Sequence, residues 1–344
     1  MKCLSLDFGG SSVKYGLVDS HARLSRTGKL PAPVHSRQEF IETVSALFAL
    51  HKDEVDGIAI SLPGYIDSGT GILVGSGAYQ ALYGCCIPDL LKETCSVPIT
   101  VENDGKCGAL SELWGGALSD CDDGVVLILG SAIAGGVIKG KKIHAGKGNT
   151  AGEFSFLLVD EGKFDYSAMA MMHCGTVGMA YKLCKLKNLN LSIQDSRQLL
   201  QRFDKLFADQ YPAFPEKPAD VKVTGEQIMQ WVEQKDPDAL AVYDEMISSL
   251  AMLIFNIQVT YAPERIVIGG GLSRSQMLFD DLLKMMKKYY ESLFMFGKLQ
   301  ADVVKSKYLE DCNLLGAAYN FMMKYNQTFS DGRSGEAWAD ETPA

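Results

Sequence analysis

The segment Val97-Pro98-Ile99-Thr100-Val101-Glu102-Asn103-Asp104 runs from an apolar stretch into residues 105–114, which are rich in small side chains. The apolar part predicts a short buried strand, and the part after Asp104 predicts a helix. Asp104 therefore stands at a strand-to-helix turn, where the edge of a sheet presents polar side chains to a ligand. Two interpretations are open at this point. Asp104 is either a helix N-cap, a role that aspartate often fills, or a catalytic carboxylate.

The composition limits the class of protein. The chain has 344 residues, of which 47% are hydrophobic, and a net charge of −9. This length predicts two domains with substantial cores, and the dispersed basic residues argue against a nucleic-acid-binding face. No apolar run approaches the roughly 20 residues of a membrane span, and Met1-Lys2 leads into a predicted strand without a signal peptide. The nine cysteines lack a Cys-x-x-Cys pair and are typical of reduced thiols, so we expect a cytoplasmic protein without membrane or nucleic-acid partners.

Residues 4–19 predict a β-hairpin whose turn is Gly9-Gly10-Ser11-Ser12. Small residues leave backbone N–H groups open to a phosphate, and the serine hydroxyls and Lys14 add donors. Asp7, at the end of the first strand, suits a hydrated Mg²⁺, because this hard cation prefers oxygen ligands and keeps its waters. A plain tight hairpin is the alternative interpretation of the same turn.

The layout of this hairpin is repeated later in the chain. Residues 124–129 predict an apolar strand, which runs into the small-residue turn 130–136 and a further strand. Two such hairpins predict a duplicated architecture with a ligand cleft between its halves. A third turn, Gly269-Gly270-Gly271-Leu272-Ser273, follows the predicted strand 265–268 and permits close approach of a flat ligand or a phosphate.

The rest of the chain predicts an alternation of helices and strands. Strands are expected over 56–62 and 302–304, and a hairpin over 66–73. Residues 38–50 predict an amphipathic helix with Phe40, Val44, Leu47 and Phe48 on its apolar face. Further helices are expected over 87–95, 167–187, 194–207, 224–235, from Pro237 to about 257, 275–292 and 314–321. Prolines 212, 215 and 218 indicate an irregular link, and the tail from about Gln327 is expected to be disordered.

This order of motifs resembles the ROK family of sugar kinases, within the actin/hexokinase/Hsp70 ATPase superfamily, over about residues 3–325. The resemblance implies an α/β, two-lobed, actin-like (ribonuclease H-like) duplicated fold with central mixed sheets and an interdomain cleft. It implies a small lobe of residues 1–117, completed by a closing helix at about 313–326, and a large lobe of residues 118–312. It also implies a homodimer.

The resemblance further implies the roles of individual residues. Asp104 would be the general base, and Asn103, Glu153, Gly64 and Asp165 would contact the sugar. Asp7 would also hold Mg²⁺ through water, so the implied cofactors are ATP and Mg²⁺. The residues expected to bind the nucleotide and its phosphates belong to the glycine-rich turns and their flanks: Asp7, Gly9, Gly10, Ser11, Ser12, Lys14, Gly130, Ser131, Ala132, Gly135, Gly269, Gly270, Gly271 and Ser273.

Several positions depart from the family pattern. Phe156 stands where members commonly have a histidine that serves zinc and the sugar, and residues 160–166 contain no cysteine, so we expect no zinc. Ala132 and Ala134 replace glycines of the second phosphate turn, where an added methyl crowds a phosphate. Residues 76–82, where the family often has a sugar-contacting asparagine, offer Ser76, Tyr79 and Gln80. The sugar pocket is therefore atypical.

The function implied is an ATP-dependent kinase acting on glucose, an N-acylated hexosamine such as N-acetylmannosamine, or a β-glucoside. One alternative is a sugar-binding ROK protein that has lost catalysis. The other is a ROK transcriptional repressor, which would carry a helix-turn-helix segment before the first hairpin. The hairpin begins at residue 4, and the net charge of −9 also argues against binding to DNA.

Overall fold

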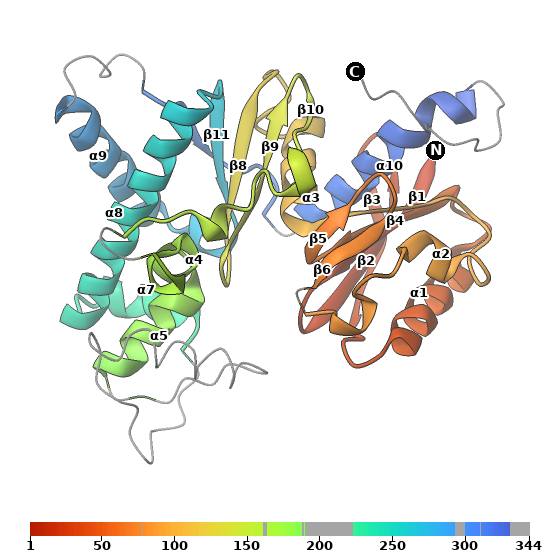
Figure 1. The fold of residues 1–344 in the computed structure, drawn as a ribbon, viewed down its shortest axis with the longest axis horizontal. Helices are drawn as coiled ribbons and strands as arrows, with labels where there is room; N and C mark the ends of the chain where they lie inside the picture. The colour runs from red at the N-terminus through yellow and green to blue at the C-terminus, as the bar shows by residue number, and fades with distance from the viewer. Residues whose placement is uncertain are drawn as a thin grey trace. The chain divides into compact units, whose positions relative to one another are not determined.

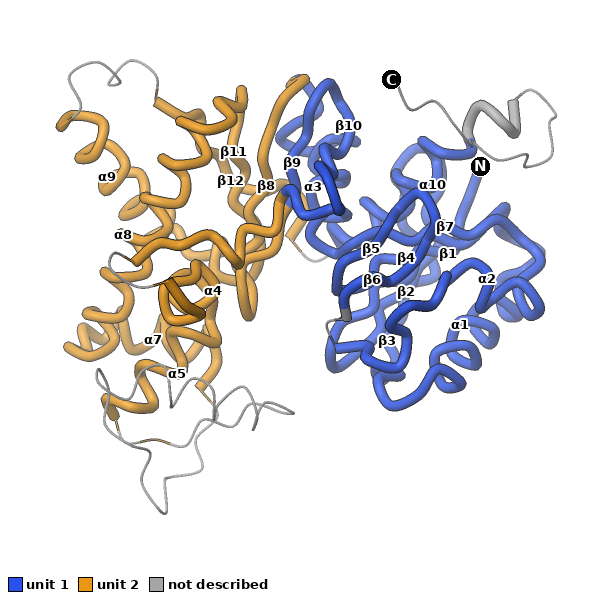
Figure 2. The backbone as a smooth tube through the Cα atoms, viewed as in Figure 1, with its two compact units in different colours: residues 1–120, 136–151, 310–344 blue, residues 121–135, 152–309 orange. Residues whose placement is uncertain are grey.

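The computed structural model describes residues 1–76, 78–160, 164–187, 189, 223–292, 300–309 and 311–330. The chain divides into two compact units, which are coloured separately in Figure 2. Unit 1 comprises Met1–Asp120, Gly136–Ala151 and the described part of Glu310–Ala344. Unit 2 comprises Cys121–Gly135 and the described part of Gly152–Leu309.

Unit 1 is built on a five-stranded mixed sheet in the order β3-β2-β1-β4-β7 (Figure 1). β1 pairs antiparallel with β2 and parallel with β4, and β4 pairs parallel with β7. A separate hairpin of β5 and β6 follows β4, as the turn residues between them predict. The strands of unit 1 are β1 (Lys2–Phe8), β2 (Ser12–Asp19), β3 (Leu24–Pro31), β4 (Gly57–Leu62), β5 (Gly64–Asp67), β6 (Ile72–Ser76) and β7 (Ile99–Asn103).

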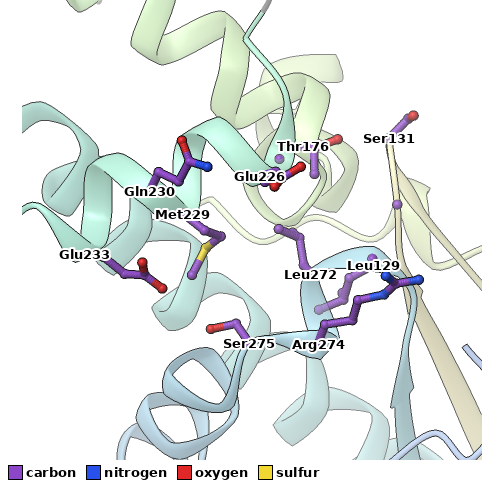
Figure 3. Close-up of a pocket in the computed structure, with 13 residues that line it drawn as sticks. Leu129, Ser131, Thr176, Glu226, Met229, Gln230, Glu233, Leu272, Arg274 and Ser275 are labelled. Carbon is purple, nitrogen blue, oxygen red and sulfur yellow. The ribbon is translucent and has the colours of Figure 1, made fainter.

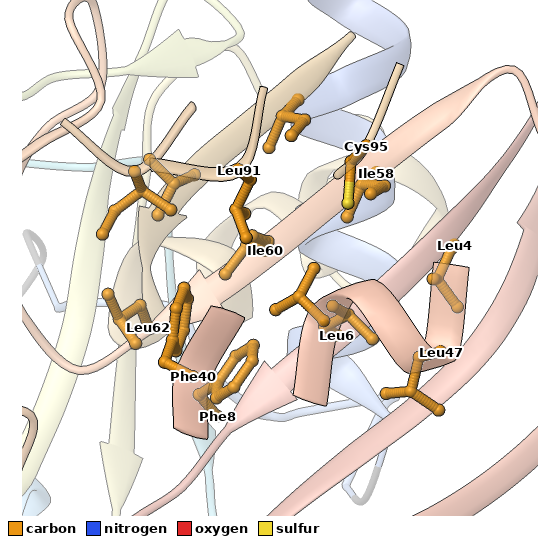
Figure 4. Close-up of a cluster of buried hydrophobic side chains, with 14 of the residues drawn as sticks. Leu4, Leu6, Phe8, Phe40, Leu47, Ile58, Ile60, Leu62, Leu91 and Cys95 are labelled. Atoms are coloured by element: carbon orange, nitrogen blue, oxygen red, sulfur yellow. The ribbon is translucent and has the colours of Figure 1, made fainter. Parts of the chain in front are cut away.

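Helices α1 (Arg37–His51) and α2 (Ile87–Leu91) pack on one face of this sheet and enclose a hydrophobic core (Figure 4). Successive residues of a strand point to opposite faces, so Leu4, Leu6 and Phe8 of β1 face this core, while Ser5 and Asp7 face the other side. The predicted apolar face of α1 is confirmed, because all four of its residues are buried. Helix α2 is shorter than the 87–95 expected.

Helices α3 (Asp104–Gly115) and α10 (Cys312–Ser330) belong to the opposite face. The Ser5 hydroxyl donates to the carbonyl oxygen of Leu314 at 2.6 Å, which ties β1 to α10. The two helices approach closely because one contact has no side chain: a Cβ on Gly316 would lie 1.7 Å from the carbonyl oxygen of Cys107. Helix α10 includes Gln327 and ends at Ser330, and the rest of the tail that was expected to be disordered lies outside the described residues.

The second sheet, whose strands β8, β11 and β12 belong to unit 2, repeats this design with the order β10-β9-β8-β11-β12. In each sheet consecutive strands occupy one side, and later strands are added in parallel on the other, so the predicted duplication is confirmed. The division between units falls within β9, whereas the expected lobes place 136–151 with the large one. Gly136 packs on α3, since a Cβ there would lie 2.7 Å from that of Ala109. The strands are β8 (Gly124–Leu129), β9 (Ile133–Lys139), β10 (Lys142–Ile143), β11 (Arg265–Gly269) and β12 (Val303–Lys305).

The described helices of unit 2 are α4 (Ala170–Cys174), α5 (Thr176–Leu186), α7 (Gly225–Glu233), α8 (Pro237–Thr260) and α9 (Gln276–Ser292). The single helix expected over 167–187 is broken at Gly175. At this position the backbone comes close to the β8–β9 turn, where a Cβ would lie 2.6 Å from the carbonyl oxygen of Ser131. Helices α7 and α8 begin at side-chain caps, Thr224 and Asp236, as their sequences predict. The helix expected over 194–207 and the proline-containing link lie outside the described residues.

Helix α8 is long and apolar enough to cross a membrane by length and composition, with a mean hydropathy of 1.4 over its most apolar 18 residues. The expectation that no such run exists overlooked it. However, 56% of that window is buried inside the protein, and α8 packs against α4, α5 and α9. This burial is that of a core helix.

The close contact between α3 and α10 predicts that Gly316→Ala destabilises the protein. The added methyl collides with backbone rather than with a flexible side chain, and such overpacking costs roughly 1–3 kcal/mol or more. The measurement is the free energy of unfolding from urea titration. Gly271→Ala is the control, because a Cβ there meets no atom within 4 Å. Equal stability of the Gly316→Ala variant and the wild type would contradict the close packing.

Candidate active site

The carboxyl ends of three parallel strands in unit 1 bring polar residues together. Asp7 of β1 is in register with Ser61 of β4, which is in register with Glu102 of β7. Such an edge is where open α/β sheets bind ligands. The chain passes from Glu102 through Asn103 into α3, so the Glu-Asn-Asp stretch lies at the same edge as Asp7.

Asp7 is held by residues from two other elements. Its Oδ1 accepts hydrogen bonds from the Ser61 hydroxyl at 3.1 Å and from Asn313 Nδ2 of α10 at 3.0 Å. Burial raises the pKa of Asp7, while these hydrogen bonds and the charge of Lys14, its register partner on β2, oppose the rise. Within the described residues both hydrogen bonds end on Oδ1, so Oδ2 is available as an acceptor for a hydrated cation.

Asn103, rather than Asp104, caps helix α3. The Asn103 Oδ1 accepts from the backbone N–H of Lys106 at 3.1 Å, and its Nδ2 donates to the carbonyl oxygen of Gly64 at 2.9 Å. Asp104 is the first helical residue, and its Oδ1 accepts from Gly105 N–H at 2.9 Å and from Asn103 Nδ2 at 3.0 Å. The interpretation of Asp104 as the N-cap is therefore wrong. Its Oδ2 accepts no hydrogen bond from another residue within the described ranges and can receive a substrate proton.

The electrostatic setting of Asp104 favours a base. Burial raises its pKa, and the negative charge of nearby Asp7 raises it further, against the hydrogen bonds from Gly105 and Asn103. A raised pKa strengthens a carboxylate as a proton acceptor. Gly64 supports this geometry from the start of β5, where a φ of 119° turns its backbone in a way that side-chain-bearing residues rarely adopt.

The first glycine-rich turn is tight, and a hydrogen bond from Tyr79 holds it in place. Gly9 N–H donates to the Ser12 carbonyl oxygen at 2.9 Å, and the residues between them are exposed. The Tyr79 hydroxyl donates to the Gly9 carbonyl oxygen at 2.8 Å. The Tyr79 ring is buried against Phe8 and Phe40, with centroid distances of 5.7 and 6.4 Å. Tyr79, considered from sequence as an available sugar contact, therefore holds the first glycine-rich turn in place.

Unit 2 contains a cavity of about 720 Å³, a volume typical of small-molecule sites (Figure 3). Its walls come from the β8–β9 turn, the start of α5, one face of α7 and the 3₁₀ turn η5 (Gly271–Arg274). The second and third glycine-rich turns therefore meet at one cavity. The lining residues are Leu129, Gly130, Ser131, Thr176, Gly225, Glu226, Met229, Gln230, Glu233, Gly271, Leu272, Arg274 and Ser275.

The β8–β9 turn is fastened to the start of α5. The backbone N–H of Thr176 donates to the Gly130 carbonyl oxygen at 2.9 Å, and that of Val177 donates to Ser131 at 3.1 Å. These helix N-terminal donors are therefore engaged with the turn, which fixes the position of Ser131 at the cavity.

The third glycine-rich turn combines a strained residue with an open one. Gly270 has a φ of 88°, and a Cβ there would lie 2.4 Å from the Leu129 carbonyl oxygen, so glycine is required. A Cβ on Gly271 would meet nothing within 4 Å, which leaves its backbone open to a ligand. Five residues that were predicted to bind the nucleotide are not among the lining residues of this cavity: Ala132, Gly135, Gly269, Gly270 and Ser273.

The face of α7 was not anticipated from sequence. Glu226, Met229, Gln230 and Glu233 follow the spacing i, i+3, i+4 and i+7, which places them on one side of a helix. This periodicity was the available signal, but it does not say that the side faces a cavity. Ile228 and Val232 are buried.

The candidate sugar ligands of unit 2 lie in a loop with short 3₁₀ turns. Glu153 is half-buried and precedes η3 (Phe154–Phe156), and Phe156 is 41% exposed. Asp165 caps η4 (Tyr166–Ala168), since its Oδ1 accepts from the backbone N–H of Ser167 at 2.8 Å and from its hydroxyl at 2.6 Å. Both roles toward a sugar stay predictions.

A polar network of the buried His173 and Lys182 with the partly exposed Glu245 ties this loop to helix α8. His173 Nε2 contacts the Ser167 carbonyl oxygen, and His173 Nδ1 contacts Glu245 Oε1, each at 2.7 Å. The same Glu245 oxygen accepts from Lys182 Nζ. Burial opposes ionisation of Glu245, but the His173 hydrogen bond and the Lys182 charge lower its pKa to about 2.

The donor set at Asp7 fits a cation held largely by other ligands. No group of three or more His, Cys, Asp or Glu side chains able to hold a metal occurs in the part of the chain that the structure describes. One carboxylate oxygen and water suit Mg²⁺, which keeps several waters and is often completed by substrate phosphates. The expectation of no zinc stays a prediction.

Comparisons with known proteins agree on one family. A model described as the ROK family matches residues 3–323. The chain is 26% identical over 328 residues to a beta-glucoside kinase of Listeria innocua, covering 95% of this chain and 99% of the relative. It is 26% identical over 318 residues to an N-acetyl-D-glucosamine kinase of Aliivibrio salmonicida, covering 91% and 97%. A ROK glucokinase from Streptomyces griseus, solved with glucose and AMPPNP, superposes with a TM-score of 0.70 at 20% identity, covering 92% and 98%.

The network at Glu245 predicts acid sensitivity of unit 2. The folded pKa of about 2 lies below the ordinary 4.5, so Glu245 stabilises the folded state above pH 4.5 and loses that contribution as the pH falls toward 2. Glu245→Gln should be less stable at pH 7 and should lose less stability between pH 4.5 and 2. Urea unfolding at several pH values measures this, with Glu291→Gln on the exposed side of α9 as control. An unchanged pH dependence in Glu245→Gln would contradict the assignment.

Proposed function

The chain belongs to the ROK family, and from that membership we propose that it is an ATP-dependent sugar kinase with Asp104 as general base. The observation that carries this proposal is the geometry of Asp104. Its carboxylate is half-buried at the sheet edge where open α/β sheets bind ligands, and its Oδ1 accepts two hydrogen bonds. Asn103, and not Asp104, caps the helix, so the capping interaction does not occupy the Asp104 carboxylate.

The reaction follows from this arrangement. A sugar hydroxyl is a weak nucleophile near neutral pH, and Asp104 accepts its proton as the hydroxyl oxygen attacks the γ-phosphorus. A bond forms between that oxygen and phosphorus, the bond from phosphorus to the β–γ bridging oxygen breaks, and ADP leaves. Asn103 holds the carboxylate in position, and its Nδ2 is shared between Gly64 and Asp104.

The nucleotide is assigned to the cavity of unit 2. The turn at Gly130 and Ser131 supports phosphate binding, and the open backbone at Gly271 allows the nucleoside to approach. In unit 1 the turn Gly9–Ser12, with Lys14, is the second proposed phosphate contact. Bound Mg²⁺ supplies positive charge to the phosphates, and Asp7 would hold it through water.

The substrate is proposed to be a hexose or a hexose derivative. The names of the relatives differ in their sugar, covering a β-glucoside, N-acetyl-D-glucosamine and glucose, so family membership leaves this choice open. Asn103, Gly64, Glu153 and Asp165 are the proposed ligands, and the exposed Phe156 ring beside Glu153 makes the pocket more apolar than a histidine would. A cytoplasmic homodimer is the accompanying prediction.

Asp104→Asn should abolish most sugar phosphorylation while preserving the fold. The amide keeps an oxygen for the Gly105 N–H but cannot take up the proton, and loss of a general base costs about 10²- to 10⁴-fold in rate. ADP formation against a panel of hexoses and β-glucosides measures this, and calorimetry with ATP checks that nucleotide still binds. Asp89→Asn on α2 is the matched control. Turnover of Asp104→Asn near the wild-type rate would refute the assignment, and a wild type that binds sugars but consumes no ATP would indicate a non-catalytic sugar-binding protein.

The pH dependence of the reaction should reflect the raised pKa of Asp104. The base works only when ionised, so kcat/KM for the sugar should fall as the pH drops through a value above the ordinary aspartate pKa of about 3.9. Removing the neighbouring charge with Asp7→Asn should lower the overall rate and move this acidic limb to lower pH. The profile is measured at saturating MgATP. A limb that moves to higher pH in Asp7→Asn would rule out the predicted coupling.

A further inference from the structure

The cavity of unit 2 has an internal order that follows from its contacts. One end is the turn at Gly130 and Ser131, whose carbonyl oxygens bind the start of α5. Thr176, at that start, lies next to the start of α7, because a Cβ on Gly225 would be 3.0 Å from Thr176 Cγ2. Glu226 follows Gly225 directly and appears beside Thr176 in Figure 3.

The face of α7 then leads away from the phosphate turn. Glu233 lies seven positions after Glu226, so it is displaced by about 10 Å along the helix at 1.5 Å per residue. Met229 and Gln230 lie between them and line the same cavity. Along the cavity, the turn at Gly130 and Ser131 is therefore followed by Glu226, then by the side chains of Met229 and Gln230, and last by Glu233.

Glu226 presents an acceptor without a cationic partner within the described residues. It makes no ion pair there, and it lies in the first turn of α7, where it lines the cavity. A carboxylate repels phosphate oxygens and requires a hydrogen-bond donor. In a nucleoside triphosphate, the donors adjacent to the phosphates are the ribose hydroxyls.

We propose that Glu226 binds the ribose hydroxyls of the nucleotide and selects ribonucleotides over deoxyribonucleotides. This inference rests on the proposed binding of ATP in the same cavity. The ribose lies between the phosphates and the base, which matches the place of Glu226 between the turn at Gly130 and the Met229 stretch. Recognition of ribose hydroxyls by an acidic side chain has the same chemistry in dinucleotide-binding folds. Glu233 is too far along α7 for this role and faces the region of the base.

The test compares the dissociation constants of ATP, 2′-deoxyATP and 3′-deoxyATP by calorimetry at one Mg²⁺ concentration and without sugar. A hydrogen bond to a charged group predicts that at least one deoxynucleotide binds the wild type about tenfold more weakly than ATP. Glu226→Ala should weaken ATP binding and bring the three constants within about twofold. Glu233→Ala, the same truncation on the same helix face, should retain the preference for ATP. Thermal unfolding confirms that both variants are folded.

The outcomes separate this inference from the proposed function. Equal affinity of the wild type for all three nucleotides overturns the inference and leaves the kinase proposal standing. A Glu226→Ala variant that loses affinity for all three by the same factor also overturns it, because the carboxylate then acts without regard to the hydroxyls. A wild type that binds none of the three nucleotides overturns both.

Discussion

The burial of two neighbouring carboxylates is the constraint on which unit 1 depends. Asp7 and Asp104 are acidic groups at one sheet edge, and desolvation together with their mutual repulsion makes ionisation of both unfavourable. The structure offsets this cost with donors on one oxygen of each: Ser61 and Asn313 for Asp7, and Gly105 and Asn103 for Asp104. The remaining oxygens are left for chemistry, so the interactions that stabilise the charges also orient them.

Unit 2 has a related sheet, but its candidate site is built differently. Its strand order matches that of unit 1, but no described carboxylate pair occupies the corresponding hairpin, and the cavity is assembled from backbone turns and one helix face. Gly270 and Gly175 permit close approaches of backbone that any side chain would block. The acidic side chains that line this cavity, Glu226 and Glu233, come from α7. The two halves therefore share an architecture, and the proposed function assigns proton acceptance to unit 1 and the nucleotide cavity to unit 2.

Local patterns in the sequence predicted most of the elements that frame the site. The Gly9–Ser12 turn, the apolar face of α1 and the Thr224 cap each depend on neighbours within a few positions, so they are readable from the chain itself. The roles of Asn103 and Asp104 were harder to predict, because both residue types cap helices well. The position at which β7 ends decides which of the two is the cap. The hydrogen bond from Asn313 to Asp7 joins residues that are 306 positions apart. It depends on how α10 packs on the sheet, which no local pattern in the sequence indicates. The cavity face of α7 likewise has a visible period but no sequence signal for what it faces.

The dependence of the first sheet on α10 has a consequence for how the protein is made. The Ser5 hydroxyl donates its hydrogen bond to Leu314, which lies 309 positions later in the chain. Asp7 accepts a hydrogen bond from Asn313. The ribosome must therefore synthesise nearly the whole chain before these two hydrogen bonds can form. During synthesis residues 1–120 can assemble the core beneath α1 and α2, but the part of the opposite sheet face that α10 covers stays exposed to water. Unit 2 can close before unit 1 is complete. The nascent protein therefore passes through a long interval with an uncovered sheet surface, in which a chaperone binding that face would protect it from aggregation.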